Sequence, residues 1–245
     1  MIKTAIIIPS RLDAQRLPNK PVKLISNKEM ILHVYEAAKK SNVGEVFVAT
    51  PDQIIFDLIQ KFGGKAILTS KNHATGTDRI FEVFKNTLNK DPNIIVNLQG
   101  DMPNIEPKAI SDLINYMQQE KCAIGTLASE FKSISELKDH NIVKVCVKEK
   151  IKPGMFVKAL DFVRTNPQKE YISYHHVGVY AFTKKALIKY VGLKRSKLEL
   201  QRNLEQLRAM ENNISIHVGF VESSPLSVDT EKDLIEVKKL MEKNG

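Results

Sequence analysis

Three cationic side chains, Arg11, Arg16 and Lys20, lie within ten residues of one another near the start of the chain. Like charges this close together repel, so an anion among them would stabilise the arrangement. Arginine binds phosphate through its planar fork and lysine binds it as a point charge. The loop is neither a Walker A sequence nor a dinucleotide-binding glycine fingerprint. It is compatible with a triphosphate site, and the alternative is a solvated basic loop.

Two aspartates are candidates for binding a divalent cation. An apolar run from Asn93 ends in Gln-Gly-Asp, which would deliver Asp101 to the carboxyl edge of a sheet, where open α/β sheets bind ligands. Magnesium commonly takes one or two carboxylates together with substrate phosphates. Asp229 precedes the last predicted helix, where the helix dipole alone would explain an acid. Spacing alone does not pair these residues, so a turn aspartate and a helix-terminal aspartate remain the alternatives.

Adjacent histidines, His175 and His176, lie in a segment with strand character. Alternation along a strand would turn them to opposite faces and would place His176 on the same face as Gly178 and Tyr180. A catalytic zinc ion takes three protein ligands, and no further ligand stands at a recognisable spacing. Zinc binding is therefore not expected here.

Composition limits the classes of function. The 245 residues fit one large α/β domain or a domain with a modest subdomain. The net charge is +9, but the lysines are spread along the chain and there is no tryptophan. Nucleic-acid binding would favour clustered cations with interleaved aromatic residues, whereas a basic field suits an enzyme with polyanionic substrates. No nucleic-acid partner is expected.

The expected compartment is the cytoplasm. The sequence has no apolar run of 18 residues that would span a membrane and no secretion signal at Met1–Ile8. Its two cysteines, Cys122 and Cys146, have no partners at metal-ligand spacing, and a disulfide framework would need more of them. We expect buried thiols in a reducing environment.

The first half of the chain alternates strand and helix. Strands are predicted at 4–8, 45–49, 65–68 and 93–98, and helices at 30–41, 52–62, 77–88 and 108–119. Buried strands without hydrophobic–polar alternation, separated by helices, indicate a parallel sheet covered on both faces. The fold class predicted is therefore α/β, with a doubly wound, mostly parallel sheet.

In the second half of the chain, predicted strands follow one another with few helices between them. Strands are predicted at 123–128, 143–147, 155–160, 174–182 and 214–218, which suggests a small mixed α+β inserted subdomain. A long helix is predicted at 197–211, with Leu200, Leu204 and Leu207 as its buried stripe. The last helix is predicted at 230–244, and Thr230 with Asp233 forms its capping pattern.

Taken together, these segments resemble the 3-deoxy-manno-octulosonate (Kdo) cytidylyltransferase family over nearly the whole chain. The most specific markers are Gly-Thr-Asp-Arg at 76–79 and Leu-Glu-Gln-Leu-Arg at 204–208. The other markers are Ile-Ile-Pro-Ser-Arg at 7–11, Arg-Leu-Pro-Asn-Lys at 16–20, Val-Ala-Thr at 48–50, Val-Asn-Leu-Gln-Gly-Asp at 96–101, His-Val-Gly-Val-Tyr at 176–180 and Val-Asp-Thr at 228–230.

The resemblance implies a single domain, 1–245, with the nucleotide-diphospho-sugar transferase fold. Its parts would be a nucleotide-binding half at about 1–128, a sugar-binding and dimerisation region at about 129–220, and a C-terminal segment at about 221–245 that returns to the core. The implied reaction transfers CMP from CTP to Kdo and releases pyrophosphate, for lipopolysaccharide biosynthesis. The resemblance further implies a cytoplasmic homodimer that uses Mg²⁺.

The resemblance also implies roles for individual residues. The catalytic group would be Arg11, Lys20, Asp101 and Asp229, with the two aspartates as the metal ligands. Nucleotide contacts would come from Arg11, Arg16, Lys20, Thr77, Arg79 and Gln99. Sugar contacts would come from Gln99, Arg164, His176, Tyr180, Glu205 and Gln206, with Arg164 pairing with the sugar carboxylate.

The sequence departs from the family pattern at four places, which leaves the sugar open. Met102 stands where the family usually has glutamate, Ser227 where it has glycine, and Arg202 where it often has an acid, and the segment around Arg164 differs. The alternative substrates are 8-amino-Kdo, a nonulosonic acid such as a sialic acid, or a polyol phosphate. A non-catalytic nucleotide-binding or nucleic-acid-binding protein is the alternative from another class, since a fold alone does not establish activity.

Overall fold

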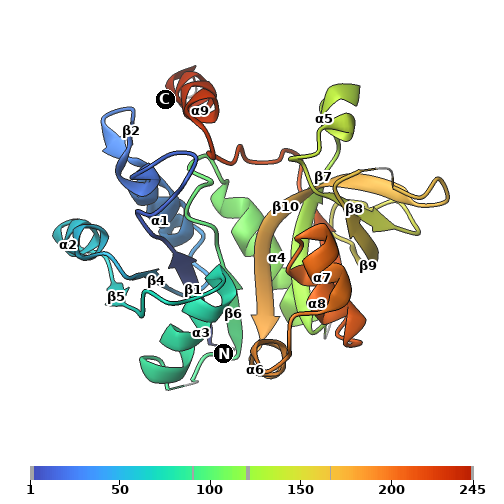
Figure 1. The fold of residues 1–245 in the computed structure, drawn as a ribbon, viewed down its shortest axis with the longest axis horizontal. Helices are drawn as coiled ribbons and strands as arrows, with labels where there is room; N and C mark the ends of the chain where they lie inside the picture. The colour runs from blue at the N-terminus through green and yellow to red at the C-terminus, as the bar shows by residue number, and fades with distance from the viewer. Residues whose placement is uncertain (1–2, 90, 120–121, 166, 244–245) are drawn as a thin grey trace. The chain divides into compact units, whose positions relative to one another are not determined.

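The computed structural model describes residues 3–89, 91–119, 122–165 and 167–243. The chain forms two compact units, and most of their helices and strands are labelled in Figure 1. The first unit comprises residues 1–111 and 225–245, and the second comprises residues 112–224. The functional division that the resemblance implies, near residues 128 and 220, stays a prediction. Within the second unit, the strand at 124–129 pairs with later strands.

A parallel sheet forms the centre of the first unit. Its strands run in the order β5-β4-β1-β6, and all three pairings are parallel. Ile6–Ile8 of β1 are fully buried, as expected for a strand covered on both faces. This confirms the predicted parallel α/β sheet. The strands are β1 (Thr4–Pro9), β4 (Glu45–Thr50), β5 (Ala66–Leu68) and β6 (Ile94–Asn97).

Two helices of the first unit begin at side-chain caps. Thr75 accepts a hydrogen bond from the Asp78 N–H at 3.1 Å and so caps α3. At α9, Asp233 N–H donates to the Thr230 hydroxyl at 3.3 Å and Thr230 N–H donates to the Asp233 carboxylate at 2.8 Å, which confirms the predicted capping pattern. The helices are α1 (Met30–Lys40), α2 (Gln53–Lys61), α3 (Gly76–Asn86) and α9 (Glu231–Lys243).

An apolar cluster joins the C-terminal segment to the loop that follows β1. A short hairpin, β2 (Leu24–Ile25) and β3 (Lys28–Glu29), turns at two residues with φ of 47° and 61°, as in a type I′ turn. The cluster lies between this hairpin, the loop and α9, and it places the segment around residue 228 beside the loop. Its buried members are Leu17, Ile25, Met30, Val228, Leu234 and Val237.

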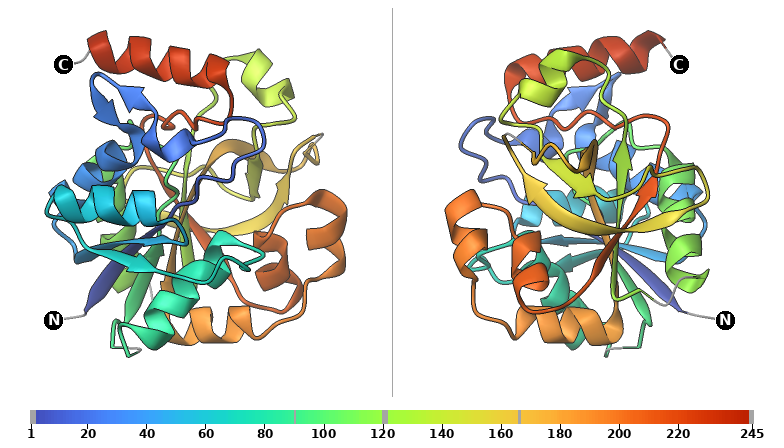
Figure 2. Two further views of the ribbon diagram at one scale, coloured as in Figure 1. Left: turned by 60° about the vertical axis from the view of Figure 1, so that its left-hand side comes forward. Right: turned by 90° about the vertical axis from the view of Figure 1, so that its right-hand side faces the viewer.

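The second unit is built on a mixed sheet. The strand order is β10-β7-β11-β9-β8, and β8 also pairs with β10, so the five strands form a closed ring. Among the described pairings of this ring, that of β7 with β11 is parallel and the other four are antiparallel, which confirms the predicted mixed pairing. The register of β10 shifts between Val177 and Tyr180, and β10 curves strongly (Figure 2). The strands are β7 (Ile124–Ser129), β8 (Lys144–Val147), β9 (Phe156–Val163), β10 (Ile172–Thr183) and β11 (Ile216–Phe220).

The prediction of one long helix at 197–211 is wrong. The structure has two short helices, α7 (Lys197–Arg202) and α8 (Gln206–Glu211). Asn203 adopts the left-handed conformation, with φ of 52°, and ends α7, and asparagine tolerates this conformation better than most residues. Leu204 and Leu207 are buried as predicted, but Leu200 is 56% exposed. The break separates Leu200 from the stripe that it would have extended.

Three further α-helices are present in the part of the chain that the structure describes. The predicted helix at 108–119 is present as α4 (Pro107–Gln119), whose residues 107–111 belong to the first unit and whose later residues belong to the second. The helices α5 (Ile134–Lys138) and α6 (Lys184–Val191) are not predicted from the sequence. Within the described residues, no helix is both long and apolar enough to cross a membrane.

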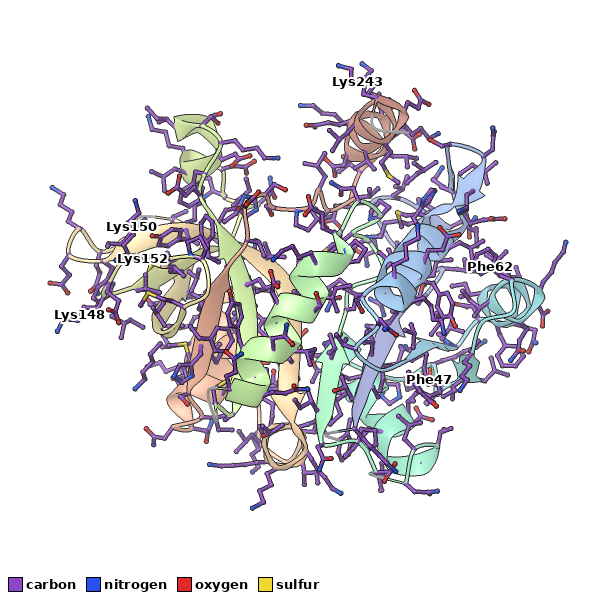
Figure 3. The ribbon with its side chains drawn as sticks, turned by 180° about the vertical axis from the view of Figure 1, so that it is seen from behind. Phe47, Phe62, Lys148, Lys150, Lys152 and Lys243 are labelled. Carbon is purple, nitrogen blue, oxygen red and sulfur yellow. The ribbon has the colours of Figure 1, made fainter. Side chains whose placement is uncertain are left out.

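Exposed lysines occur in both units. Lys148, Lys150 and Lys152 extend from the connection between β8 and β9, and Lys243 lies at the end of α9 (Figure 3). All four are exposed.

Gly219 of β11 tests the packing of the second unit. A Cβ at Gly219 would lie 2.7 Å from a ring carbon of Tyr116 and 3.1 Å from Phe156, and these two rings stack at 5.0 Å between centroids. We expect Gly219→Ala to lower the free energy of unfolding by about 1–3 kcal/mol, because the rings must shift. Denaturant unfolding measures the change.

Gly192 provides the matched control. It ends α6 with an ordinary helical φ of −73°, and a Cβ there would meet nothing closer than 3.5 Å. Gly192→Ala should leave the free energy of unfolding unchanged or slightly raised, because alanine restricts the unfolded chain. Equal losses in the two variants would contradict this packing.

Candidate active site

The cationic loop leaves the carboxyl end of β1 and is fixed by its neighbours. Ser10 N–H donates to the Ala49 carbonyl at the end of β4, at 2.9 Å. Leu12 N–H donates to the Asp52 carboxylate at 2.8 Å. The loop therefore starts from the carboxyl ends of two adjacent parallel strands, the location predicted for a ligand site. Asp52 is missed by sequence reasoning, because its position after the second strand suggests only a helix cap.

The Gln-Gly-Asp turn lies against the start of the same loop. A Cβ at Gly100 would lie 3.1 Å from the Pro9 carbonyl oxygen and 3.2 Å from the side chain of Ile31. The absence of a side chain at Gly100 allows this close approach, which holds the turn after β6 against the end of β1.

The structure brings four of the predicted residues together: two cations, Arg16 and Lys20, contact two carboxylates. Lys20 Nζ lies 2.9 Å from Asp101 Oδ2 and 3.2 Å from Asp229 Oδ1. Arg16 lies 3.0 Å from Asp229 Oδ2. Burial lowers the pKa of Lys20, but the attraction of Asp101 and Asp229 outweighs this, so the net pKa is raised. The loop after β1, the turn after β6 and the segment before α9 therefore meet at one point.

The two carboxylates fit a divalent cation. Asp101 Oδ1 is buried and has no hydrogen-bond partner, so it is an anionic oxygen without a proton donor. Val228 N–H donates to the Asp101 carbonyl at 2.9 Å and keeps the two segments in register. Among the described residues, no group of three histidine, cysteine, aspartate or glutamate side chains gathers at one point. A magnesium ion at Asp101 and Asp229 would complete its shell with water and phosphate oxygens.

A second cationic position lies at the start of α3. Arg79 is 3% exposed and donates to the Thr69 hydroxyl and, at 2.9 Å, to the Ser70 carbonyl. Burial and the nearby charge of Arg11 lower the pKa of Arg79. Two guanidinium groups that repel each other at the carboxyl edge of the sheet form a region of positive potential that would attract an anion.

The remaining nucleotide-binding candidates, Gln99 and Thr77, are linked through Asn97 by hydrogen bonds. Gln99 Nε2 donates to Asn97 Oδ1 at 3.2 Å, and Asn97 Nδ2 donates to the Thr77 hydroxyl at 3.3 Å. Asn97 is buried at the end of β6. It was not among the predicted site residues, although it lies within the Val-Asn-Leu-Gln run that carries the resemblance.

The loop before α3 is held by a group that sequence reasoning misses. Glu82 accepts two hydrogen bonds from the Ser70 N–H, the shorter at 3.0 Å, and a short contact joins it to His73 Nε2. Burial raises the pKa of Glu82, but the contacts with His73 and Ser70 outweigh this and leave the net pKa lowered. Since the Ser70 carbonyl accepts from Arg79, Glu82 fixes the loop that orients the guanidinium. Glu82 has no sequence signal beyond its place on a helix.

In the second unit, His176 and Tyr180 share a face of β10 as predicted, with ring centroids 5.4 Å apart. His175 has different neighbours, stacking on Phe131 at 6.2 Å. Burial, and secondarily the charge of His175, lowers the pKa of His176 to about 3. Burial, helped by Tyr190 and Glu205, raises the pKa of Tyr180 well above its usual value. Both rings are therefore neutral at pH 7.

Thr126 determines which ring nitrogen of the neutral His176 carries the proton. The Thr126 hydroxyl lies 2.7 Å from the Val179 carbonyl oxygen and 3.0 Å from His176 Nε2. A hydroxyl has one proton, and it is directed at the carbonyl at the shorter distance. The hydroxyl oxygen then accepts from His176 Nε2–H, which leaves Nδ1 as the acceptor nitrogen of the ring.

The Leu-Glu-Gln-Leu-Arg segment has a structural part and a candidate binding part. Arg208 donates twice to the buried carboxylate of Glu199, at 2.8 and 2.6 Å, and lies over the Tyr190 ring at 4.7 Å. The ion pair between Glu199 of α7 and Arg208 of α8 holds these two helices together. Glu205 and Gln206 lie where α8 begins, and Glu205 is close enough to Tyr180 to contribute to its raised pKa.

Arg164 follows the end of β9. Its guanidinium donates to the carbonyls of His140 and Asn141 at 3.3 and 3.2 Å. Lys144 is fully buried and donates to three carbonyls, including that of Arg164 at 2.8 Å. Arg164 is thus held by backbone oxygens of the segment before β8, and the structure places no carboxylate beside it within the described residues.

Comparison with known proteins identifies the family. The sequence profile of the family described as cytidylyltransferase matches residues 5–216. A 3-deoxy-manno-octulosonate cytidylyltransferase from Bartonella tribocorum is 39% identical over 245 residues, which cover 98% of this chain and 99% of the relative. One from Thermodesulfovibrio yellowstonii is 40% identical over 249 residues, which cover 97% and 98%.

Solved structures agree with the sequence comparison. The structure of CMP:2-keto-3-deoxy-manno-octonic acid synthetase in complex with CTP is 37% identical and covers 99% of this chain and 100% of its own, with a TM-score of 0.89. A 4-diphosphocytidyl-2C-methyl-D-erythritol synthase from Anaerococcus prevotii, 17% identical and covering 98% of each chain, shares the fold with a TM-score of 0.65. The chain therefore has the predicted nucleotide-diphospho-sugar transferase fold and belongs to the 3-deoxy-manno-octulosonate cytidylyltransferase family.

Proposed function

We propose that this chain transfers CMP from CTP to Kdo and releases pyrophosphate, with Mg²⁺ held by Asp101 and Asp229. The observation that carries the proposal is the convergence of Lys20, Asp101 and Asp229 beside the cationic loop. Family membership supplies the two substrates. The reaction gains a bond from the sugar hydroxyl oxygen to the α-phosphorus and loses the bond to pyrophosphate, while the hydroxyl proton passes to solvent.

The side chains of the first unit suit this chemistry. Phosphoryl transfer depends on positioning and on neutralising negative charge, because the protein forms no covalent intermediate. Arg11, Arg16 and Lys20 are the proposed ligands of the triphosphate, and fixed cations there would stabilise the departing pyrophosphate. When bound, Mg²⁺ would add Lewis-acid stabilisation of the phosphate oxygens. Thr77, Arg79 and Gln99 are the proposed contacts to the cytidine and the reacting centre.

The side chains of the second unit suit a polyhydroxylated sugar. Neutral His176 and Tyr180 can exchange hydrogen bonds with hydroxyl groups without a charge of their own. Glu205 and Gln206 add acceptors and an amide at the start of α8. Arg164, also of the second unit, is the proposed partner of the sugar carboxylate. Membership of the family supports assignment to lipopolysaccharide biosynthesis in the cytoplasm, as a homodimer.

Pyrophosphate release tests the reaction. We expect release from CTP only when Kdo and Mg²⁺ are both present, with no-sugar and EDTA reactions as controls. Release with 8-amino-Kdo or a nonulosonic acid but not with Kdo would keep the mechanism and replace the substrate. A folded sample that releases no pyrophosphate with any acidic sugar would contradict the proposal and favour a non-catalytic nucleotide-binding protein.

Asp101→Asn tests the metal role. The substitution keeps the shape of the side chain but removes the charge of a half-buried carboxylate whose Oδ1 is buried. We expect the rate of pyrophosphate release to fall at least about a thousandfold, because electrostatic stabilisation of this kind contributes several kcal/mol. Circular dichroism should show an intact fold. A near-normal rate in the folded variant would exclude Asp101 as a required metal ligand.

His176→Gln tests the neutrality of the sugar-side histidine. The folded pKa of about 3 lies below the usual 6.5, so between these values the unfolded state binds the extra proton. The contribution of His176 to stability is therefore complete above pH 6.5 and is lost as the pH falls towards 3. The difference in unfolding free energy between wild type and variant should change by about 1.4 kcal/mol per pH unit between pH 6 and pH 4. Parallel curves for the two proteins would contradict a neutral, buried imidazole.

A further inference from the structure

The ammonium group of Lys20 lies between the two carboxylates that are the proposed metal ligands. Its Nζ is 2.9 Å from Asp101 Oδ2 and 3.2 Å from Asp229 Oδ1, and the side chain is 14% exposed. A metal ion that used these two oxygens would need them to release the ammonium. Lys20 and a divalent cation therefore compete for the same oxygens, although Lys20 is also a proposed ligand of the triphosphate.

We propose that Lys20 holds Asp101 and Asp229 in place as an internal cation until the nucleotide arrives, and that it moves to the triphosphate when the metal enters. This inference rests on the proposed function, because it takes the metal and the triphosphate from that reaction. It adds a second position for Lys20 and an order of events: the metal binds well only together with the nucleotide.

The need for an internal cation follows from the surroundings of the carboxylates. Asp101 and Asp229 share one ammonium, so without it two negative charges would stand close together with partial burial. Asp101 Oδ1 is buried without a partner, which makes an unpaired charge there costly. Arg16 also contacts Asp229, but its side chain is 61% exposed, and solvent weakens such a pair. Lys20 is therefore the principal cation of the cluster.

The direction of the coupling follows from the charges around Lys20. A metal that binds alone must displace the ammonium towards a loop that already carries Arg11 and Arg16, whose positive charges repel it. A bound triphosphate supplies an anion to receive it. The backbone does not need to move, because Lys20 begins the short helix η1 (Lys20–Val22), in which Pro21 is buried, and the four-carbon stem can rotate. Metal and nucleotide should therefore strengthen each other's binding reciprocally.

Mn²⁺ binding to the free protein tests the proposal, because Mn²⁺ can be followed by electron paramagnetic resonance without nucleotide, sugar or turnover. Wild-type protein should bind Mn²⁺ weakly alone and at least about tenfold more tightly with CTP. In Lys20→Met, which keeps the length of the side chain and removes its charge, Mn²⁺ alone should bind at least about tenfold more tightly than to wild type, because the competing cation is gone. Asp101→Asn in the same background should abolish this gain.

Lys23→Met is the matched control. Lys23 lies three residues further along the loop and pairs with Glu231 at 3.5 Å, so the substitution removes the same charge from the same segment. It should leave Mn²⁺ affinity at the wild-type value. Lys20→Arg, which keeps a cation, should also bind Mn²⁺ weakly.

Thermal melting supplies a second readout. Without metal, Lys20→Met should melt below wild type, because the two carboxylates lose their cation, and Mn²⁺ should restore its melting temperature. A variant that folds only with Mn²⁺ would support the proposal equally. Unchanged or weaker Mn²⁺ binding in Lys20→Met, or a loss of folding that Mn²⁺ does not repair, would overturn it. The proposed function is tested separately by pyrophosphate release, which this binding experiment does not use.

Discussion

The contact of one ammonium with two carboxylates organises the functional part of the first unit. Lys20, Asp101 and Asp229 come from segments separated by 81 and 209 residues, so the fold must place all three within hydrogen-bonding distance. The parallel sheet places the loop after β1 and the turn after β6 at the same edge. The apolar cluster under α9, which includes Leu17 and Val228, then brings the C-terminal segment to the loop. The charged cluster thus depends on buried apolar contacts that are made elsewhere.

Much of the first unit was predictable because its signals are local. Buried β-branched runs and helical periodicity locate the strands and helices, and the short connections leave few possible topologies. The second unit was less predictable because its structure depends on single residues and on non-local pairing. Asn203 breaks a segment whose leucine spacing is typical of one helix. The closure of the ring through β8 and β10 depends on residues far apart in the sequence.

The site was predictable in its members but not in its connections. The cationic loop and Asp101 could be chosen from charge and position alone, whereas Asp229 could be joined to them only through a family resemblance. The number of residues between Asp229 and the cationic loop does not show that an apolar cluster brings the two together in the fold. Residues that hold others in place, such as Asp52 and Glu82, were not predicted for a related reason: a single acidic residue near a helix has many ordinary structural roles. In the structure, Asp52 accepts a hydrogen bond from the loop backbone, and Glu82 fixes the segment whose Ser70 carbonyl accepts from Arg79.

The departures from the family pattern have different physical consequences. Ser227 does not have a positive φ, so a glycine is not required there. Met102 is 7% exposed, so the thioether is accommodated as a packing residue where an acid would have needed a partner. Arg202 donates to the carboxylate of Asp161 at 2.7 Å and to the Phe162 carbonyl at 3.1 Å, so its charge is neutralised within the second unit. Since none of the three alters the contacts among Lys20, Asp101 and Asp229, any change in substrate would have to arise from the residues proposed to contact the sugar, with the phosphate chemistry left intact.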